Sequence, residues 1–139
     1  MIVIAIIACL SVIVAPSLMK FVAKAKRTEA YVILRSLALA QKAYFAEYGH
    51  YTTNLFGPQG LSWKPEGNYN YTYGFNGGTE GQSHFIGQLK TPVSALQGAR
   101  ITPQGFTAYA AGDIDGDGEP DILSIDQDNV IKIVKDDLN

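Results

Sequence analysis

The sequence of 139 residues contains a single cysteine, Cys9. No disulfide can form within one copy of the chain, so an exported domain would need another device to hold its loops together. The sequence also lacks a glycine-rich phosphate-binding loop, and neither of its two histidines belongs to a catalytic or metal-binding motif. These absences argue against an enzyme and against a transition-metal site.

Charged residues are absent from residues 1–19, which read MIVIAIIACLSVIVAPSLM. A helix of this length spans roughly 28 Å at about 1.5 Å per residue, close to the apolar thickness of a bilayer. The segment has no basic stretch at its start and no clear small-residue cleavage site, so we expect it to be retained rather than removed as a signal peptide. We therefore predict an apolar segment of membrane length.

The helical pattern continues without a break beyond this segment. Apolar residues recur at steps of three and four from Phe21 to Tyr48, and the first strong stop signal is Gly49. We expect one helix of roughly 72 Å at about 1.5 Å per residue, which a domain of this size cannot bury along its whole length. The sequence thus divides into an apolar helix segment (1–19), an amphipathic continuation of the helix (20–48) and a head (49–139). The first half must lie in lipid or against copies of itself.

The charges are divided unevenly between helix and head. The chain carries a net charge of +4 through Tyr48 and −6 from Gly49 onward. Nucleic-acid-binding modules usually present a basic face, so the acidic head predicts no specific nucleic-acid partner. The basic stretch from Lys20 to Arg27 could contact DNA or anionic lipid, but we favour a solvated helix face or an anchor at the membrane edge.

The head has the sequence pattern of a small antiparallel sheet. Two prolines and three glycines between His50 and Asn68 predict a connecting loop, and aromatic residues then alternate with polar ones over residues 69–75. Further strands are expected at 84–89, 105–111, 121–125 and 130–134. We predict an α+β fold in which the second half of the helix packs on this sheet. Its core is expected to contain Leu34, Leu37, Phe45, Tyr71 and Tyr73.

An acidic loop near the C-terminus carries the strongest chemical pattern. Residues 113–121 read DIDGDGEPD, with carboxylates at loop positions one, three, five and nine and a glycine at position six. A calcium loop uses these offsets, and the backbone carbonyl at position seven is a further ligand. The candidate ligands are Asp113, Asp115, Asp117, Glu119 and Asp121.

This loop differs from an EF-hand, because position twelve is Ser124 rather than glutamate and the flanking sequence is strand-like. Asp126 or Asp128 could complete the coordination. Magnesium fits less well, since it requires octahedral geometry and retains its waters. We predict a structural calcium ion, and the alternative is a solvated turn without a ligand.

The N-terminal residues resemble a known family. The run MIVIAII, Pro16 within VAPS, and KAKRTEAYVILRSLALAQKAYFAEYGHYTT are similar to the N-terminal helix of type IV pilins and of type II secretion pseudopilins. In that family a short segment with a glutamate precedes MIVIAII and follows the prepilin peptidase site, so Met1 matches an internal methionine of the motif. The resemblance implies an inner-membrane anchor that later packs in the core of a helical filament. The residues expected in that filament core are Ile4, Ile7, Leu10, Val14 and Pro16.

Two other functions remain open beside that of a structural subunit of an extracellular pilus-like filament. The chain could be the major pseudopilin of a type II secretion system, which forms a periplasmic filament. It could also be a monomeric, membrane-anchored calcium-binding domain. For the first two functions the expected partners are further copies of the chain and the pilus or secretion assembly machinery.

Overall fold

One long helix dominates the structure, as the sequence predicts. The structure is a computed structural model, which describes residues 1–56, 60–65, 67–114, 116 and 118–136, and for residues 11–20 the backbone alone. Helix α1 extends from Ile2 to Tyr48 and ends at Gly49, whose φ of 79° is left-handed and whose N–H donates to the carbonyl of Phe45 at 2.8 Å. A left-handed C-terminal residue is the usual role of glycine at a helix end, so the expected stop signal is confirmed.

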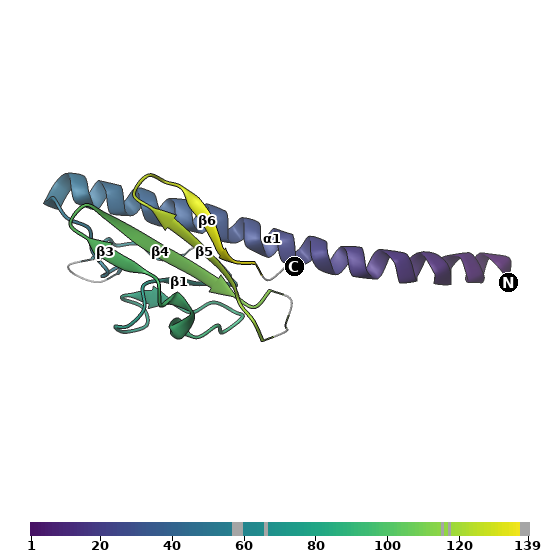
Figure 1. Cartoon of the computed structure of the whole chain (residues 1–139). Coiled ribbons are helices and arrows are strands. Elements are labelled where there is room, and N and C mark those ends of the chain that lie inside the picture. The colour runs from purple at the N-terminus through teal and green to yellow at the C-terminus, as the bar shows by residue number, and fades with distance from the viewer. Residues whose placement is uncertain (57–59, 66, 115, 117, 137–139) are drawn as a thin grey trace.

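The first part of α1 projects away from the rest of the molecule (Figure 1). Ile4, Ile7 and Leu10 are 72%, 57% and 55% exposed. The side chains of Val14 and Pro16 lie outside the described residues. Among the residues whose side chains are described, no helix is both long and apolar enough to cross a membrane.

The head is an antiparallel sheet that crosses the second half of α1 (Figure 1). Its strands lie in the order β2-β1-β4-β5-β6, and β3 pairs with the first half of β4. The strands are β1 (Thr72–Gly74), β2 (His84–Phe85), β3 (Arg100–Thr102), β4 (Gly105–Gly112), β5 (Asp121–Asp126) and β6 (Ile131–Lys135), and a short 3-10 helix, η1, covers Val93–Leu96. The long helix and the small sheet together confirm the predicted pilin-like α+β fold.

The core lies between α1 and the sheet. Small residues on β4, Ala108 and Ala110, are fully buried and pair with Ile125 and Leu123 of β5. Alanines at these positions leave room for the larger side chains that the helix presents. Four of the expected core residues are fully buried: Leu34, Leu37, Tyr71 and Tyr73.

Phe45 differs from this expectation, because it is 38% exposed. It lies one turn before the end of α1, and its ring stacks on Tyr51 of the following loop with centroids 4.6 Å apart. The expected strand at 69–75 is also shorter, and all three residues of β1 are buried. All three are buried because α1 covers one face of the sheet while η1 contacts β1 and β4 on the other.

Candidate functional site

A half-buried carboxylate on the helix holds the start of the sheet. Glu29 accepts hydrogen bonds from the backbone N–H and the side-chain amide of Asn70, at 2.9 and 3.1 Å, and from the Tyr73 hydroxyl at 2.9 Å. Burial raises the pKa of Tyr73 far above its ordinary value, and the negative charge of Glu29 raises it further. Glu29 thereby satisfies polar groups of residues 70–73 beneath the helix.

A second polar cluster joins the helix to the last two strands, and we name it the Arg27 cluster (Arg27, Tyr71, Asp121 and Asp136). Arg27 donates through Nε and Nη2 to both oxygens of Asp121, at 3.0 and 2.6 Å, and through Nη2 to Asp136 at 2.5 Å. The Tyr71 hydroxyl donates to Asp121 at 2.7 Å. Hydrogen bonding to Asp121 raises the pKa of Arg27, and burial together with the Asp121 carboxylate raises that of Tyr71. Two fork-like bonds to a fully buried carboxylate form a strong charge-assisted contact.

This cluster changes the assignment of Asp121, which the loop spacing predicts as a calcium ligand. Its side chain is fully buried and both oxygens bind the helix and Tyr71, because Arg27 brings a permanent positive charge to the start of β5. The loop spacing contains no sign of this contact, since the two partners are 94 residues apart.

The acidic loop itself is organised by Asp113. Its two carboxylate oxygens accept the backbone N–H groups of Gly116 and Gly118 at 3.0 and 2.8 Å, and both glycines have left-handed φ values. The Glu119 carboxylate forms an ion pair with Lys135. Asp115 and Asp117 lie outside the described residues, and the described part of the chain contains no group of three possible ligands. Calcium binding by this loop stays a prediction.

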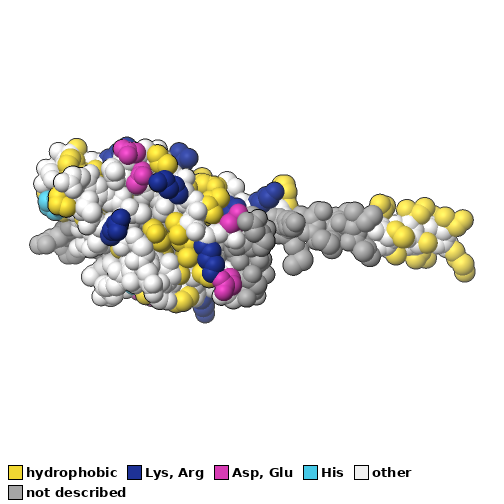
Figure 2. Space-filling model, in the orientation of Figure 1, with side chains coloured by type: hydrophobic (Ala, Val, Ile, Leu, Met, Phe, Trp, Pro, Cys, Tyr) yellow, Lys and Arg dark blue, Asp and Glu magenta, His cyan; other side chains and the backbone are white. Residues whose placement is uncertain are grey.

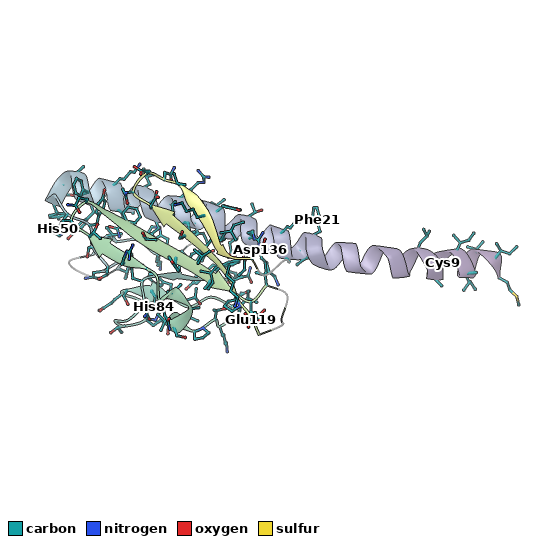
Figure 3. All side chains as sticks on the ribbon, in the orientation of Figure 1. Cys9, Phe21, His50, His84, Glu119 and Asp136 are labelled. Atoms are coloured by element: carbon teal, nitrogen blue, oxygen red, sulfur yellow. The ribbon has the colours of Figure 1, made fainter. Side chains whose placement is uncertain are left out.

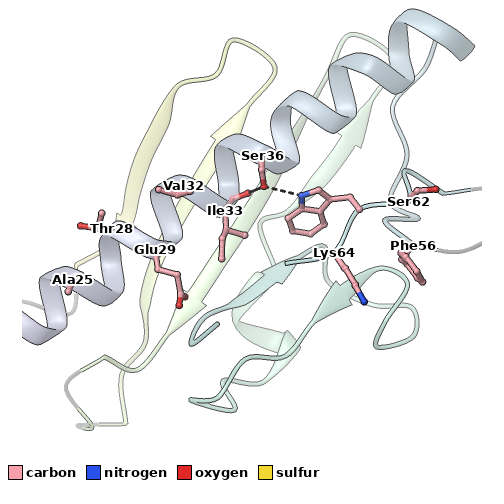
Figure 4. Close-up of a pocket in the computed structure, with 10 residues that line it drawn as sticks. Ala25, Thr28, Glu29, Val32, Ile33, Ser36, Phe56, Ser62 and Lys64 are labelled. Carbon is pink, nitrogen blue, oxygen red and sulfur yellow. Dashed lines mark hydrogen bonds between the residues drawn. The ribbon is translucent and has the colours of Figure 1, made fainter. Parts of the chain in front are cut away.

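A large hollow lies between α1 and the loop that follows it (Figure 4). It has a volume of about 830 Å³, and the loop side is formed by Phe56, Trp63 and Lys64. Trp63 donates its indole N–H to Ser36 at 3.0 Å, and the Lys64 ammonium lies 5.8 Å from the centre of the Phe56 ring. The one carboxylate in the lining, Glu29, is occupied by Asn70 and Tyr73. The hollow therefore offers shape and apolar surface rather than acid-base chemistry.

Two exposed cations lie on the face of the sheet that points away from the helix, which we call the outer face. Leu123 and Ile125 belong to the core, so Ser124 and its partner on β6, Lys132, point the other way. By the same alternation, Arg100 shares the outer face with Thr107. Figure 2 shows Lys and Arg side chains scattered over the head in this view. Three inter-strand spacings separate β3 from β6, or about 14 Å.

Comparison with known proteins gives one family match. The model of the family described as type IV minor pilin ComP, DNA uptake sequence receptor, matches residues 16–87. This range holds most of α1, the loop after it, β1 and β2. No curated protein matches the chain.

This match corrects the expectation that the chain has no specific nucleic-acid partner, because the matched family is described as a receptor for DNA. The net charge of the head led to the wrong prediction. Net charge sums over the whole surface, whereas a DNA contact depends on the charges of one face. On the outer face Asp126 pairs with Thr107, the partner of Arg100, and its carboxylate accepts the backbone N–H groups of Asp128 and Val130.

Proposed function

Because the chain belongs to the family of the type IV minor pilin ComP, DNA uptake sequence receptor, we propose that it is a minor pilus subunit that binds DNA through its head. It is a pilus component and not an enzyme, as the sequence predicts. The family is one of minor pilins, which favours a receptor displayed within a pilus over the main building block of the filament. We further propose that the chain resides in the membrane before assembly and then on the pilus surface.

The exposed apolar helix determines which face of the head meets DNA. Residues 1–10 are exposed and wholly apolar, so in water they require neighbouring copies or other pilins around them. If the helices pack inside a filament, the helix side of the head faces inward. The part of the outer face that η1 does not cover then remains accessible to a long, stiff duplex. We therefore propose the outer face as the DNA contact.

Arg100 and Lys132 are the residues on this face suited to bind phosphate. Both are exposed and stand on strands of the same sheet, which fixes their spacing. Lys135 on the same hairpin is engaged by Glu119. Contacts to phosphate supply affinity and orientation without reading sequence, so recognition of a DNA uptake sequence requires further contacts to bases.

The first test measures DNA binding as a function of salt. The double variant Arg100→Ala/Lys132→Ala is expected to weaken binding to a duplex that contains a DNA uptake sequence and to a scrambled duplex by the same factor. It should also lower the slope of log affinity against log salt by about 2, since each phosphate contact contributes about 0.9. Fluorescence anisotropy of labelled duplexes at several salt concentrations measures both quantities.

Arg35→Ala/Lys42→Ala is the matched control, because it removes the same charge from exposed positions of α1. It should leave the salt slope within error of the wild type. An equal fall in slope for both variants would contradict the proposed face, and a fall caused only by Lys64→Ala would place the contact on the loop. A wild-type chain that binds both duplexes equally would contradict the receptor function itself.

We also propose that the 113–121 loop binds calcium. The proposal is supported by the spacing of its acidic residues, which follows the ligand positions of a calcium loop. Asp115→Ala is the suitable variant, because Asp113 already supports the loop through two backbone N–H groups without any metal. The substitution is expected to lower the melting temperature by several degrees in calcium and to have no effect in EDTA. Magnesium at the same concentration is the control. An equal loss in EDTA would show that the residue acts without the metal.

A further inference from the structure

Three aromatic rings form an exposed cluster where α1 ends. The Tyr44 and Tyr48 rings lie 4.5 Å apart between centroids, and the His50 imidazole meets the Tyr44 ring edge-on at 5.3 Å. Tyr48 is 57% exposed and His50 is also exposed. Figure 3 shows His50 at the end of the head opposite to Cys9 and the projecting part of the helix. We call these three residues the aromatic platform.

The platform is held in place by its neighbours. Tyr44 and Tyr48 are one helical turn apart, so the helix sets their spacing. The left-handed Gly49 then reverses the chain and brings His50 back against Tyr44. Rings that are already fixed lose little conformational freedom when a ligand stacks on them.

A second row of rings connects this end of the helix to the sheet. Phe45 stacks on Tyr51, and Tyr51 meets Phe106 of β4 edge-on at 5.0 Å. Phe106 pairs with Ile101 of β3, the residue next to Arg100. The platform and the proposed phosphate contact are therefore attached to the same strand pair.

We propose that the aromatic platform stacks on an unpaired nucleobase of DNA, at a frayed end or in a single-stranded stretch. The proposal rests on the proposed DNA-binding function and adds a second contact of a different kind. A nucleobase has a flat π face that matches an exposed ring, and such stacking is tolerant of sequence. The hydroxyl and imidazole edges keep the platform hydrated while it is empty, which suits a polar ligand better than a buried protein interface.

The experiment compares two single-stranded probes of equal length and charge. One is oligothymidylate, and the other carries abasic sites in place of the thymines. Wild-type protein, as the full chain in detergent, is expected to bind the oligothymidylate about fivefold or more tightly than the abasic probe. Tyr48→Ala should bring the two affinities together by weakening only the oligothymidylate, and Tyr48→Phe should keep the difference.

Phe56→Ala is the matched control, since it removes another exposed ring, on the loop beside the hollow, and should keep the preference for bases. Fluorescence of Trp63, the only tryptophan, reports whether each variant is folded. Equal wild-type affinity for both probes, with duplex binding present, would overturn the platform alone. If the wild type does not bind duplex DNA at all, the proposed function itself is wrong. If the Tyr48→Ala variant still prefers oligothymidylate over the abasic probe, the bases stack at another site.

Discussion

Replacing Arg27 by methionine is expected to lower the free energy of unfolding by about 3–5 kcal/mol, the usual loss when one partner of a buried ion pair is removed. The Asp121 side chain is fully buried and would lose both of its charge-assisted hydrogen bonds from Arg27. Methionine retains most of the aliphatic length, so the loss reports the missing charge more than a cavity. Guanidinium unfolding of the full chain in detergent, followed by Trp63 fluorescence, measures the change.

Two further variants make this prediction specific. Arg35→Met changes the same residue type at an exposed position of the same helix and should alter stability by no more than about 0.5 kcal/mol. Arg27→Met/Asp121→Leu also removes the buried carboxylate that Arg27 compensates and should recover part of the loss. A loss below about 1 kcal/mol for Arg27→Met would show that the ion pair contributes little beyond the cost of burying it.

The Arg27 cluster also attaches the sheet of the head to helix α1. Asp121 begins β5 directly after the acidic loop, and Asp136 follows β6, so one arginine fixes both strands to the helix. Glu29, half a turn further along, fixes residues 70–73. A pull on DNA bound to the sheet would thus pass to the helix through charged contacts as well as through the apolar core.

The regular elements were predictable because they depend on local patterns. The helix agrees with its expected end, and β4, β5 and β6 each agree with the expected strands to within one residue. Strand β3 was not predicted, because Arg100 to Thr102 is too short to show alternation. It matters here because it carries Arg100.

The contacts between helix and sheet were not predictable in this way. Arg27 looks like one more cation of a basic stretch, and Asp121 like one more acid of a calcium loop. Their pairing joins positions 94 residues apart, and no local period reports such a contact. A nucleic-acid partner was wrongly excluded for a related reason, since the sequence shows only the sum of the head's charges, whereas the strand register shows which of them share a face.

The second large effect concerns alkaline pH, where stability is expected to fall as the two buried tyrosines begin to ionise in the unfolded chain. Burial raises the pKa of Tyr71 and of Tyr73 far above the ordinary value near 10, with the carboxylates of Asp121 and Glu29 adding to it. Above about pH 10 the unfolded chain therefore binds fewer protons than the folded one. Each tyrosine lowers the free energy of unfolding by about 1.4 kcal/mol per pH unit in this range, and below about pH 10 neither has an effect.

Denaturant titrations between about pH 8 and about pH 11 test this. Tyr73→Phe should remove roughly half of the alkaline slope attributable to the two residues, although it also lowers stability at neutral pH because Glu29 loses a hydrogen bond. Tyr48→Phe, at an exposed position, should leave the slope unchanged. If Tyr73→Phe kept the full slope, the tyrosine would have access to water in the folded state, and the closed packing of Tyr73 beneath α1 would be contradicted.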